Sequence, residues 1–190
     1  MRKLLGTALV VAGTVIPGVA TAQAGHDMGG MPKHEFGVDI FAAYQKPSGG
    51  SGGLLVTTPV DVRVGFVSSG NMMFETRSSL AFASGGGTFL SFTPGLNVLF
   101  RMGHGTGNHN LMGRYFTVGA DVNIQSFKIT GLPSTSGAVI GINGGIGTRS
   151  AYGSGATRIE LFGRYLLKNT KLGVPNTIQI GARLGLSLWH

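Results

Sequence analysis

The chain has 190 residues, a formal net charge of +8, 34 glycines and no cysteine. The lack of cysteine excludes disulfide bonds, thiol chemistry and thiolate metal sites. Charged residues make up only 12% of the chain, the mean hydropathy is +0.24, and after residue 24 no apolar run is long enough for a spanning helix. An exported chain of this kind is either a soluble β-protein or an outer-membrane barrel.

Residues 1–24 have the pattern of an export signal. Arg2 and Lys3 form a basic start, an apolar stretch follows, and Ala-Gln-Ala at residues 22–24 supplies a small-x-small cleavage site. We expect cleavage near Ala24. A membrane anchor that stays in place is the alternative, which the glycines and the proline of the apolar stretch disfavour because they weaken a spanning helix.

Residues 25–34 are predicted to form a mobile periplasmic tail. The tail contains His26 and His34 together with two methionines. Imidazole and thioether ligands suit copper, so both histidines are candidate metal ligands. A disordered polar tail without a metal is the competing interpretation. No cofactor is expected elsewhere in the chain.

The remaining residues, 35–190, alternate between apolar and polar positions over eight segments, with clusters of Gly, Ser, Asn and Pro between them. Segments of about 12–16 residues are longer than the strands of most soluble sheets and exceed the roughly 9–11 residues that cross a bilayer. We therefore predict a single all-β domain, an eight-stranded antiparallel up-and-down transmembrane β-barrel. The expected strands are 35–46, 54–67, 72–83, 88–102, 114–129, 138–149, 156–168 and 176–190.

The last expected strand, 176–190, has the clearest alternation. Its isoleucines and leucines fall on one face, and Arg183 falls on the other. The apolar face should meet lipid. We expect Arg183 to face Glu160 on the neighbouring strand, or Asp39 and Glu35 across the closure. The free edge should pair with the first strand, because only closure removes an exposed edge.

Charged side chains test these assignments. When the faces are set from apolar residues alone, every acid and every arginine of the expected strands is assigned to the opposite face; an arginine facing lipid would cost roughly 2–4 kcal/mol at the bilayer centre. The interior of an eight-stranded barrel is only wide enough for side chains, and buried charges must pair. We therefore predict a plugged, ion-paired lumen, with a gated ion path as the alternative. The network should contain Glu35, Asp39, Asp61, Arg63, Glu75, Arg77, Arg101, Asp121, Arg158, Glu160, Arg164 and Arg183, with Arg149 on the same face.

Aromatic and basic residues gather at the ends of the outward faces. Such aromatic girdles are typical of membrane barrels, although aromatic residues favour any strand. Lysines at an outer rim suit the phosphates of lipopolysaccharide, at about 1 kcal/mol per charge, or are simply tolerated at an interface. The expected outer-rim lysines are Lys46, Lys128, Lys168 and Lys171. The expected periplasmic girdle is Phe36, Phe66, Phe74, Phe100, Phe116 and Trp189, and the outer one is Tyr44, Phe82 and Tyr165.

With its export signal, eight alternating segments, ionic interior and C-terminal strand, the chain resembles the small eight-stranded outer-membrane barrels, the OmpA-barrel and OmpX-like group. The resemblance covers nearly all of the mature chain. It implies an outer-membrane location, contact with the lipid bilayer and lipopolysaccharide, and recognition of the final strand by the barrel-assembly machinery, usually through a terminal Phe. This chain ends in Trp189-His190 instead.

The most consistent function is a structural or interaction role at the cell surface, performed by a monomer. A narrow passive pore is one alternative, and a soluble periplasmic barrel or a barrel with a weak metal-binding His/Met tail is another. No enzyme is expected: the Gly-Gly-Ser-Gly-Gly run at 49–53 has the composition of a linker, and the topology puts all five histidines on the periplasmic side, away from the outer lipid interface. No basic stripe with stacking aromatics points to nucleic acid.

Overall fold

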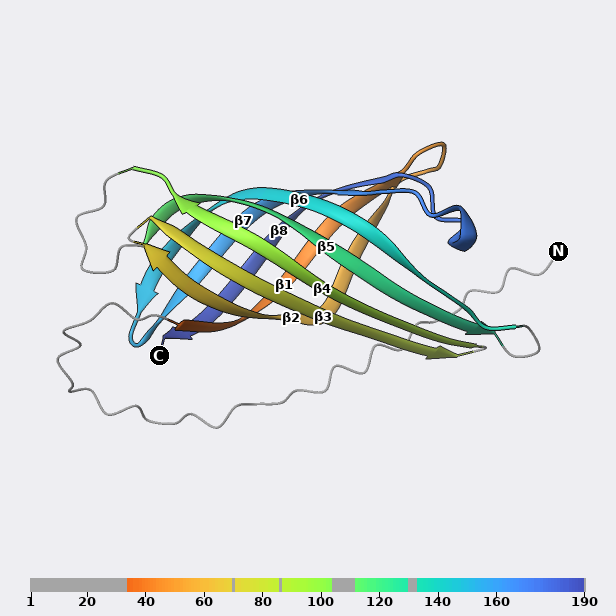
Figure 1. The fold of residues 1–190 in the computed structure, drawn as a ribbon, viewed down its shortest axis with the longest axis horizontal. Coiled ribbons are helices and arrows are strands. Elements are labelled where there is room, and N and C mark those ends of the chain that lie inside the picture. The colour runs from red at the N-terminus through yellow and green to blue at the C-terminus, as the bar shows by residue number, and fades with distance from the viewer. Residues whose placement is uncertain (1–33, 70, 86, 104–111, 130–132, 190) are drawn as a thin grey trace.

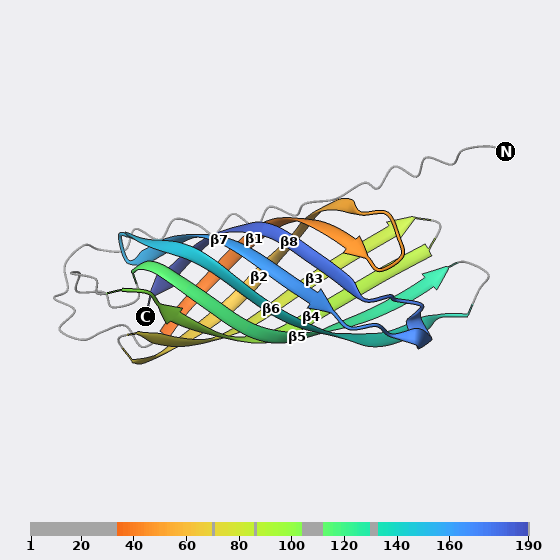
Figure 2. The same ribbon diagram turned by 90° about the horizontal axis from the view of Figure 1, so that it is seen from above.

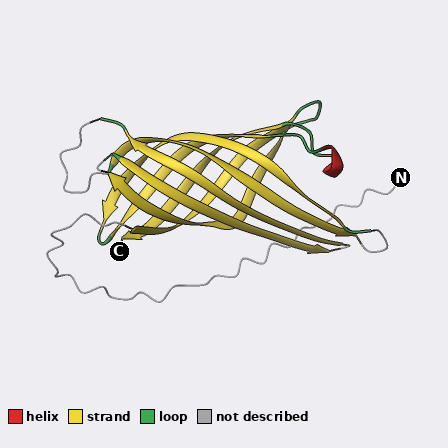
Figure 3. Cartoon of the chain, in the orientation of Figure 1, coloured by secondary structure: helices red, strands yellow, loops and turns green. Residues whose placement is uncertain are grey.

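The computed structural model describes residues 34–69, 71–85, 87–103, 112–129 and 133–189. They form antiparallel strands, each hydrogen-bonded to the next, and the last pairs with the first to close a barrel (Figure 1). Strands account for nearly all of the described chain (Figure 3). The strands are β1 (His34–Pro47), β2 (Gly53–Ser69), β3 (Met72–Gly85), β4 (Gly87–Arg101), β5 (Gly113–Ile129), β6 (Thr135–Tyr152), β7 (Gly155–Leu166) and β8 (Thr177–Trp189). No helix in these ranges is long and apolar enough to cross a membrane.

Closure follows the pairing expected from the sequence. β8 pairs with β1 from Trp189 opposite Glu35 to Thr177 opposite Pro47, without interruption. The predicted all-β, eight-stranded, antiparallel up-and-down barrel is confirmed. The predicted export signal, most of the tail and His190 lie outside the described residues.

The connections divide between the two ends of the barrel. The C-terminus lies at the same end as the β2–β3 and β6–β7 turns, and the β1–β2 and β7–β8 connections lie at the other end (Figures 1 and 2). The β7–β8 connection contains a single 3₁₀ turn, η1 (Thr170–Leu172), where a plain turn was expected. The turn forms because the Asn169 side chain accepts hydrogen bonds from two backbone N–H groups and Gly173 ends it at φ 65°.

Strand boundaries differ from the expected ones mainly in β6 and β7. β6 begins at Thr135, three residues before the expected start, and β7 ends at Leu166, two residues before the expected end. In β6 the residues Ser136 and Gly137, expected in a turn, pair with β5 and extend the ladder. Leu172 of η1 packs over Gly137, where an added Cβ would lie 2.8 Å from Leu172 Cγ.

Along part of the barrel wall, β2 and β3 are not paired. The β2–β3 ladder runs from Met72 to Ser78 on β3 and ends where Ser78 meets Val62. Beyond that point β2 pairs only with β1 and β3 only with β4. The β1–β2 connection and the β3–β4 hairpin accordingly diverge at that end of the barrel (Figure 1). Pro59 lies in this part of β2, and proline, which has no N–H, is characteristic of strand edges.

Side chains alternate between an exposed outer face and a buried interior. On β8, for example, Ile180 is 64% exposed and Leu186 58%, whereas their neighbours Gln179 and Ser187, on the other face, are buried. Two sequence assignments are wrong. Arg114 lies on the outer face, because it is on the same side of β5 as Phe116, and its position at the strand end leaves it exposed. Trp189 pairs with lumen-facing Glu35, so its register is that of the interior and not of an outward girdle.

Candidate functional site: the ionic lumen

Charged side chains fill the middle of the barrel. Arg63, on β2, is 1% exposed and lies at the centre of the group nearest the C-terminal end. Its Nε is 3.0 Å from Asp39 Oδ1, and its Nη1 is 2.5 Å from Glu35 Oε1 and 3.4 Å from Glu75 Oε2. Glu35 also pairs with Arg149 across the barrel. One guanidinium thus links strands β1, β2 and β3.

Arg158, on β7, approaches Glu75 and Asp39, which Arg63 also contacts from β2. Its Nη1 donates to Glu75 Oε2 at 2.7 Å and its Nη2 to Glu160 Oε2 at 3.0 Å. Its Nη2 is also 3.6 Å from Asp39 Oδ2. Because Glu75 is shared by Arg63, Arg77 and Arg158, the removal of its charge would leave three cations short of a partner.

Glu160 accepts hydrogen bonds from a second cluster of lumen side chains. The Tyr115 hydroxyl donates to Glu160 Oε2 at 2.8 Å, and Arg183 Nη1 donates to Glu160 Oε1. The guanidinium of Arg183 also lies 4.5 Å from the centre of the Phe162 ring. Of the partners expected for Arg183, the structure brings Glu160 to it, together with Asp61 at 3.8 Å. Asp39 and Glu35 are instead held by Arg63.

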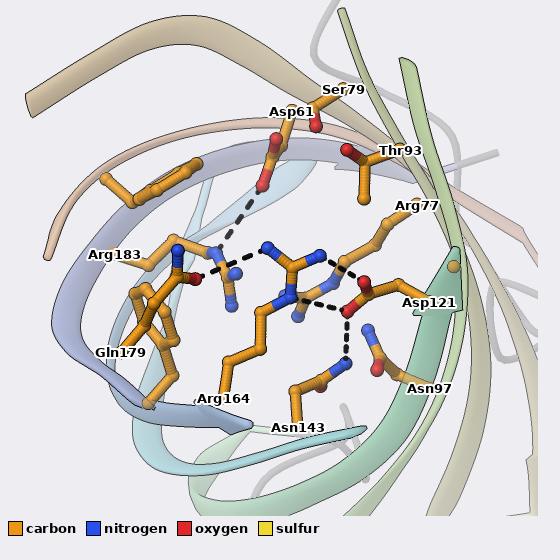
Figure 4. Close-up of a pocket in the computed structure, with 13 residues that line it drawn as sticks. Asp61, Arg77, Ser79, Thr93, Asn97, Asp121, Asn143, Arg164, Gln179 and Arg183 are labelled. Atoms are coloured by element: carbon orange, nitrogen blue, oxygen red, sulfur yellow. Dashed lines mark hydrogen bonds and ion pairs between the residues drawn. The ribbon is translucent and has the colours of Figure 1, made fainter. Parts of the chain in front are cut away.

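A polar cavity lies beyond this network, toward the η1 end. It has a volume of about 60 Å³, room for a few water molecules. Arg164 pairs with Asp121 through both Nε and Nη2, Asn143 donates to the same carboxylate at 3.1 Å, and Gln179 accepts from Arg164 at 3.3 Å (Figure 4). Asp61 enters the cavity from β2, next to Ser79 (Figure 4).

Glycines make room for these large side chains. A Cβ on Gly37 would lie 2.5 Å from Arg63 Cζ, and one on Gly185 would lie 1.9 Å from Asp39 Oδ1. Real Cβ atoms do not approach other atoms so closely. The narrow interior therefore holds arginine and carboxylate side chains only because the facing backbone has no side chain of its own.

Apolar side chains also lie in the lumen, next to the charged ones. Met73, Leu99 and Tyr115 form a fully buried cluster toward the C-terminal end. Phe41 and Phe162 meet edge to face with ring centres 5.7 Å apart beside the cavity. The lumen is thus occupied by side chains at several levels.

The remaining predicted residues take different positions. Arg101 ends β4 in the lumen-facing register and is half-buried, and Arg149, outside the expected network, belongs to it through Glu35. The four expected rim lysines are all exposed, at or beyond the strand ends on the η1 side: Lys46, Lys128, Lys168 and Lys171.

The candidate metal ligands are only partly described. His34 is exposed and its ring meets that of Phe66 edge to face at 5.6 Å, while His26 lies outside the described residues. Within the described ranges no three acidic or histidine side chains are grouped as a metal would require.

Tyr115 is one of the lumen residues that sequence reasoning missed. Its neighbour Phe116 was assigned outward, so alternation already placed Tyr115 inside. The hydroxyl that reaches Glu160, 45 positions further along the chain, could not be read from the sequence.

Several buried polar atoms have no hydrogen-bond partner among the described residues. Three of them belong to side chains that line the cavity: Asp61 Oδ1, Arg77 Nη2 and Arg183 Nε. The two nitrogens lie near carboxylates, at 3.6 Å from Glu160 and 3.8 Å from Asp61, which is too long for a hydrogen bond. All three atoms, two donors and one acceptor, are themselves buried.

No protein-family model matches the chain, and no curated protein matches its sequence. The fold is similar to that of the Neisserial surface protein A, with 12% identity over 85% of this chain and 99% of that protein, and a TM-score of 0.56. Lower similarities are found to the outer-membrane protein OprG from Pseudomonas aeruginosa (11% identity, 85% and 98% covered, TM-score 0.48) and to Ail, the attachment invasion locus protein of Yersinia pestis (14%, 84% and 99%, 0.47). At this level of identity the likeness to the Neisserial protein concerns the fold.

Proposed function

We propose that the chain is an integral outer-membrane barrel with a closed, ion-paired lumen that acts as a structural or interaction protein at the cell surface and not as a pore. The observation that carries this proposal is the reversal of the usual arrangement of a soluble protein. Leucines, isoleucines and phenylalanines cover the outside, while arginines and acids fill the inside. Only an apolar solvent makes such a distribution favourable.

The large apolar area of the outer face supports membrane insertion. Leu161 is 60% exposed and Leu188 61%, and similar side chains continue around all of the described strands. Soluble monomers rarely expose apolar patches beyond a few hundred Å². Heat-modifiable migration in detergent gels and retention in the membrane fraction after a urea wash would support insertion. Recovery of the folded chain in the aqueous periplasmic fraction would contradict it.

The side chains that occupy the lumen favour a role other than conduction. An ion would have to pass the Arg63, Arg158 and Glu75 group, whose side chains are each 1% exposed, and then the Met73 cluster. Planar-bilayer recordings of the purified protein should therefore show no steady conductance. A reproducible ohmic conductance that changes when Glu75 is neutralised would instead favour the narrow passive pore.

The exposed lysines support an anionic-lipid partner at the outer rim. With the C-terminal end in the periplasm, Lys46 and Lys168 lie at the outer end, where lipopolysaccharide phosphates lie, and each contributes about 1 kcal/mol. Replacement of the four rim lysines by Gln should weaken binding to lipopolysaccharide vesicles. Arg114→Gln, which removes an exposed cation at the opposite end, is the control and should leave that binding unchanged.

The closing strand is the segment that would be read during assembly. Trp189 ends β8, so Trp189→Ala should lower the fraction of chain assembled by the barrel-assembly machinery, measured as the heat-modifiable form. An unchanged assembled fraction would mean that the terminal aromatic is not the signal.

A further inference from the structure

The exposed lysine and arginine side chains of the described strands and turns have no acidic counterparts. Each of the six acidic side chains in the described strands lies in the lumen and is at most 9% exposed. The exposed cations are the four rim lysines at the η1 end and Arg114 at the other end. Within the described ranges, the outer rim therefore has no carboxylate that could share a divalent cation with a lipid phosphate. A phosphate would have to meet the lysines directly.

Two of the rim lysines stand on either side of the start of β8. Lys46, near the end of β1, pairs with Ile178 of β8. On the other side, the backbone N–H of Lys168 donates to Asn176 Oδ1 at 2.9 Å. The carbonyl of Asn176 accepts from the N–H of Ser48, two residues after Lys46, at 2.7 Å. Asn176 thus joins the two stretches of backbone that carry these lysines.

The wall around Lys46 has the character of a membrane interface. Lys46 has the outward register, because Ile178, directly opposite, is 51% exposed. Tyr44, two residues nearer the middle of β1, is 51% exposed, and a Cβ on Gly52 of the β1–β2 connection would lie 1.9 Å from its hydroxyl oxygen. Tyr165 of β7 lies opposite Ile178 on the same face. Outward tyrosines lie at head-group level in membrane barrels, which places Lys46 at the level of lipid phosphates.

The other two rim lysines lie elsewhere on the rim. Lys128 is on β5, which is four strands from β1 in either direction around the closed barrel and so lies across from it. Lys171 is in η1, whose Leu172 packs over Gly137 of β6. The rim lysines are therefore not equivalent.

We propose that Lys46 and Lys168 form a metal-independent binding site for the phosphorylated head of lipopolysaccharide, with one phosphate at each lysine and the acyl chains along Ile178 and Ile180. The inference rests on the membrane location and the lipopolysaccharide contact proposed above, and assigns that contact to one side of the barrel. The lysines take the place of the divalent cations that bridge phosphates of neighbouring lipids. The apolar wall directly below the lysines favours a lipid over a soluble polyanion, which would gain nothing from that wall.

The test uses the full folded chain in detergent micelles, and its insertion into phosphatidylcholine vesicles is checked separately by heat-modifiable migration. Bisphosphoryl lipid A, monophosphoryl lipid A and phosphatidylglycerol are added in turn. Native mass spectrometry measures the fraction of barrels that carry one bound lipid. Each titration is made once with EDTA and once with millimolar Mg²⁺.

Two double variants that remove equal charge locate the site. Lys46→Gln with Lys168→Gln removes both proposed phosphate contacts, and Lys128→Gln with Lys171→Gln removes the same charge elsewhere on the rim. The unaltered protein should bind bisphosphoryl lipid A about fivefold more tightly than monophosphoryl lipid A, which is the factor expected for one more contact between a lysine and an anionic lipid. The first variant should lose this preference. The second should keep it, although its overall affinity for anionic lipid falls.

The effect of Mg²⁺ is an independent readout on the unaltered protein. Binding of bisphosphoryl lipid A should persist in EDTA and weaken as Mg²⁺ is added, because the cation competes with the lysines for the phosphates. A requirement for Mg²⁺, an equal loss of the preference in both double variants, or equally tight binding of phosphatidylglycerol would each overturn the site. Absence of binding by every anionic lipid would contradict the proposed lipopolysaccharide partner as well, and failure to insert into vesicles would contradict the membrane location.

Discussion

Neutralisation of Glu75 should strongly destabilise the barrel. In Glu75→Gln the side chain keeps its shape, but an amide nitrogen can replace the oxygen that lies 2.7 Å from Arg158 and 3.4 Å from Arg63. The interaction of Arg77 with the other oxygen weakens too, since the acceptor is no longer charged. The number of buried acidic side chains then falls from six to five, while the number of buried arginines stays the same.

The magnitude follows from those contacts. Hydrogen bonds to charged groups contribute roughly 1.5–3 kcal/mol each, and breaking a buried ion pair costs about 3–5 kcal/mol. We expect Glu75→Gln to lower the free energy of unfolding by about 3–5 kcal/mol. The assay is urea unfolding in lipid vesicles, followed by the fluorescence of Trp189, the one tryptophan of the chain.

Two further variants separate charge from packing. Thr76→Val changes the adjacent, outward-facing residue and should alter the unfolding free energy by no more than about 0.5 kcal/mol. The double variant Glu75→Gln with Arg77→Met removes one of the stranded cations and should be less destabilised than the sum of the two single changes. A loss below about 1 kcal/mol for Glu75→Gln would refute the idea that this carboxylate holds three arginines together.

Three further tests address the space in the lumen, a buried hydrogen bond and the outer face. Gly37→Ala and Gly185→Ala should each cost about 1–3 kcal/mol by displacing Arg63 or Asp39, while Gly163→Ala, whose nearest atom is 4.0 Å away, should be near neutral; equal effects in the same urea assay would contradict the space argument. Tyr115→Phe should cost about 1–2 kcal/mol because it removes the hydroxyl that donates to buried Glu160, and a neutral result would mean that this bond adds nothing. Ile180→Arg should cost roughly 2–4 kcal/mol in bilayers, whereas a change near zero would place that face in water.

Much of this fold can be predicted because period-two alternation assigns every residue of a strand once one residue is placed. Ile178 outward implies Arg183 inward, and the same reasoning covers the acids of β1 and the arginines of β7. The wrong assignment of Arg114 shows where this reasoning weakens. At a strand end the outer face meets the interface and no longer the hydrocarbon, so a charge there is tolerated.

The partners within the lumen could not be predicted, because alternation gives direction but not depth or reach. Arg149 and Glu35 are 114 positions apart and meet only because long side chains cross the interior. The room that Gly37 leaves for Arg63 is likewise set by neighbouring strands. The end of the β2–β3 ladder at Val62 and Ser78 could not be predicted, because the apolar–polar alternation continues past it. Pro59 in β2 is the one residue there that indicates a strand edge.

The location of the outer face in lipid is the central claim, and a spin-label scan of β8 tests it most directly. The chain has no cysteine, so single cysteines at 178–188 can each carry a nitroxide in the refolded protein in vesicles. Labels at Ile180, Leu184 and Leu186 should collide with oxygen, which concentrates in hydrocarbon, and not with a water-soluble nickel chelate. Labels at Gln179 and Ser187 should collide with neither. Frequent collisions of the outward labels with the nickel chelate would contradict the membrane barrel.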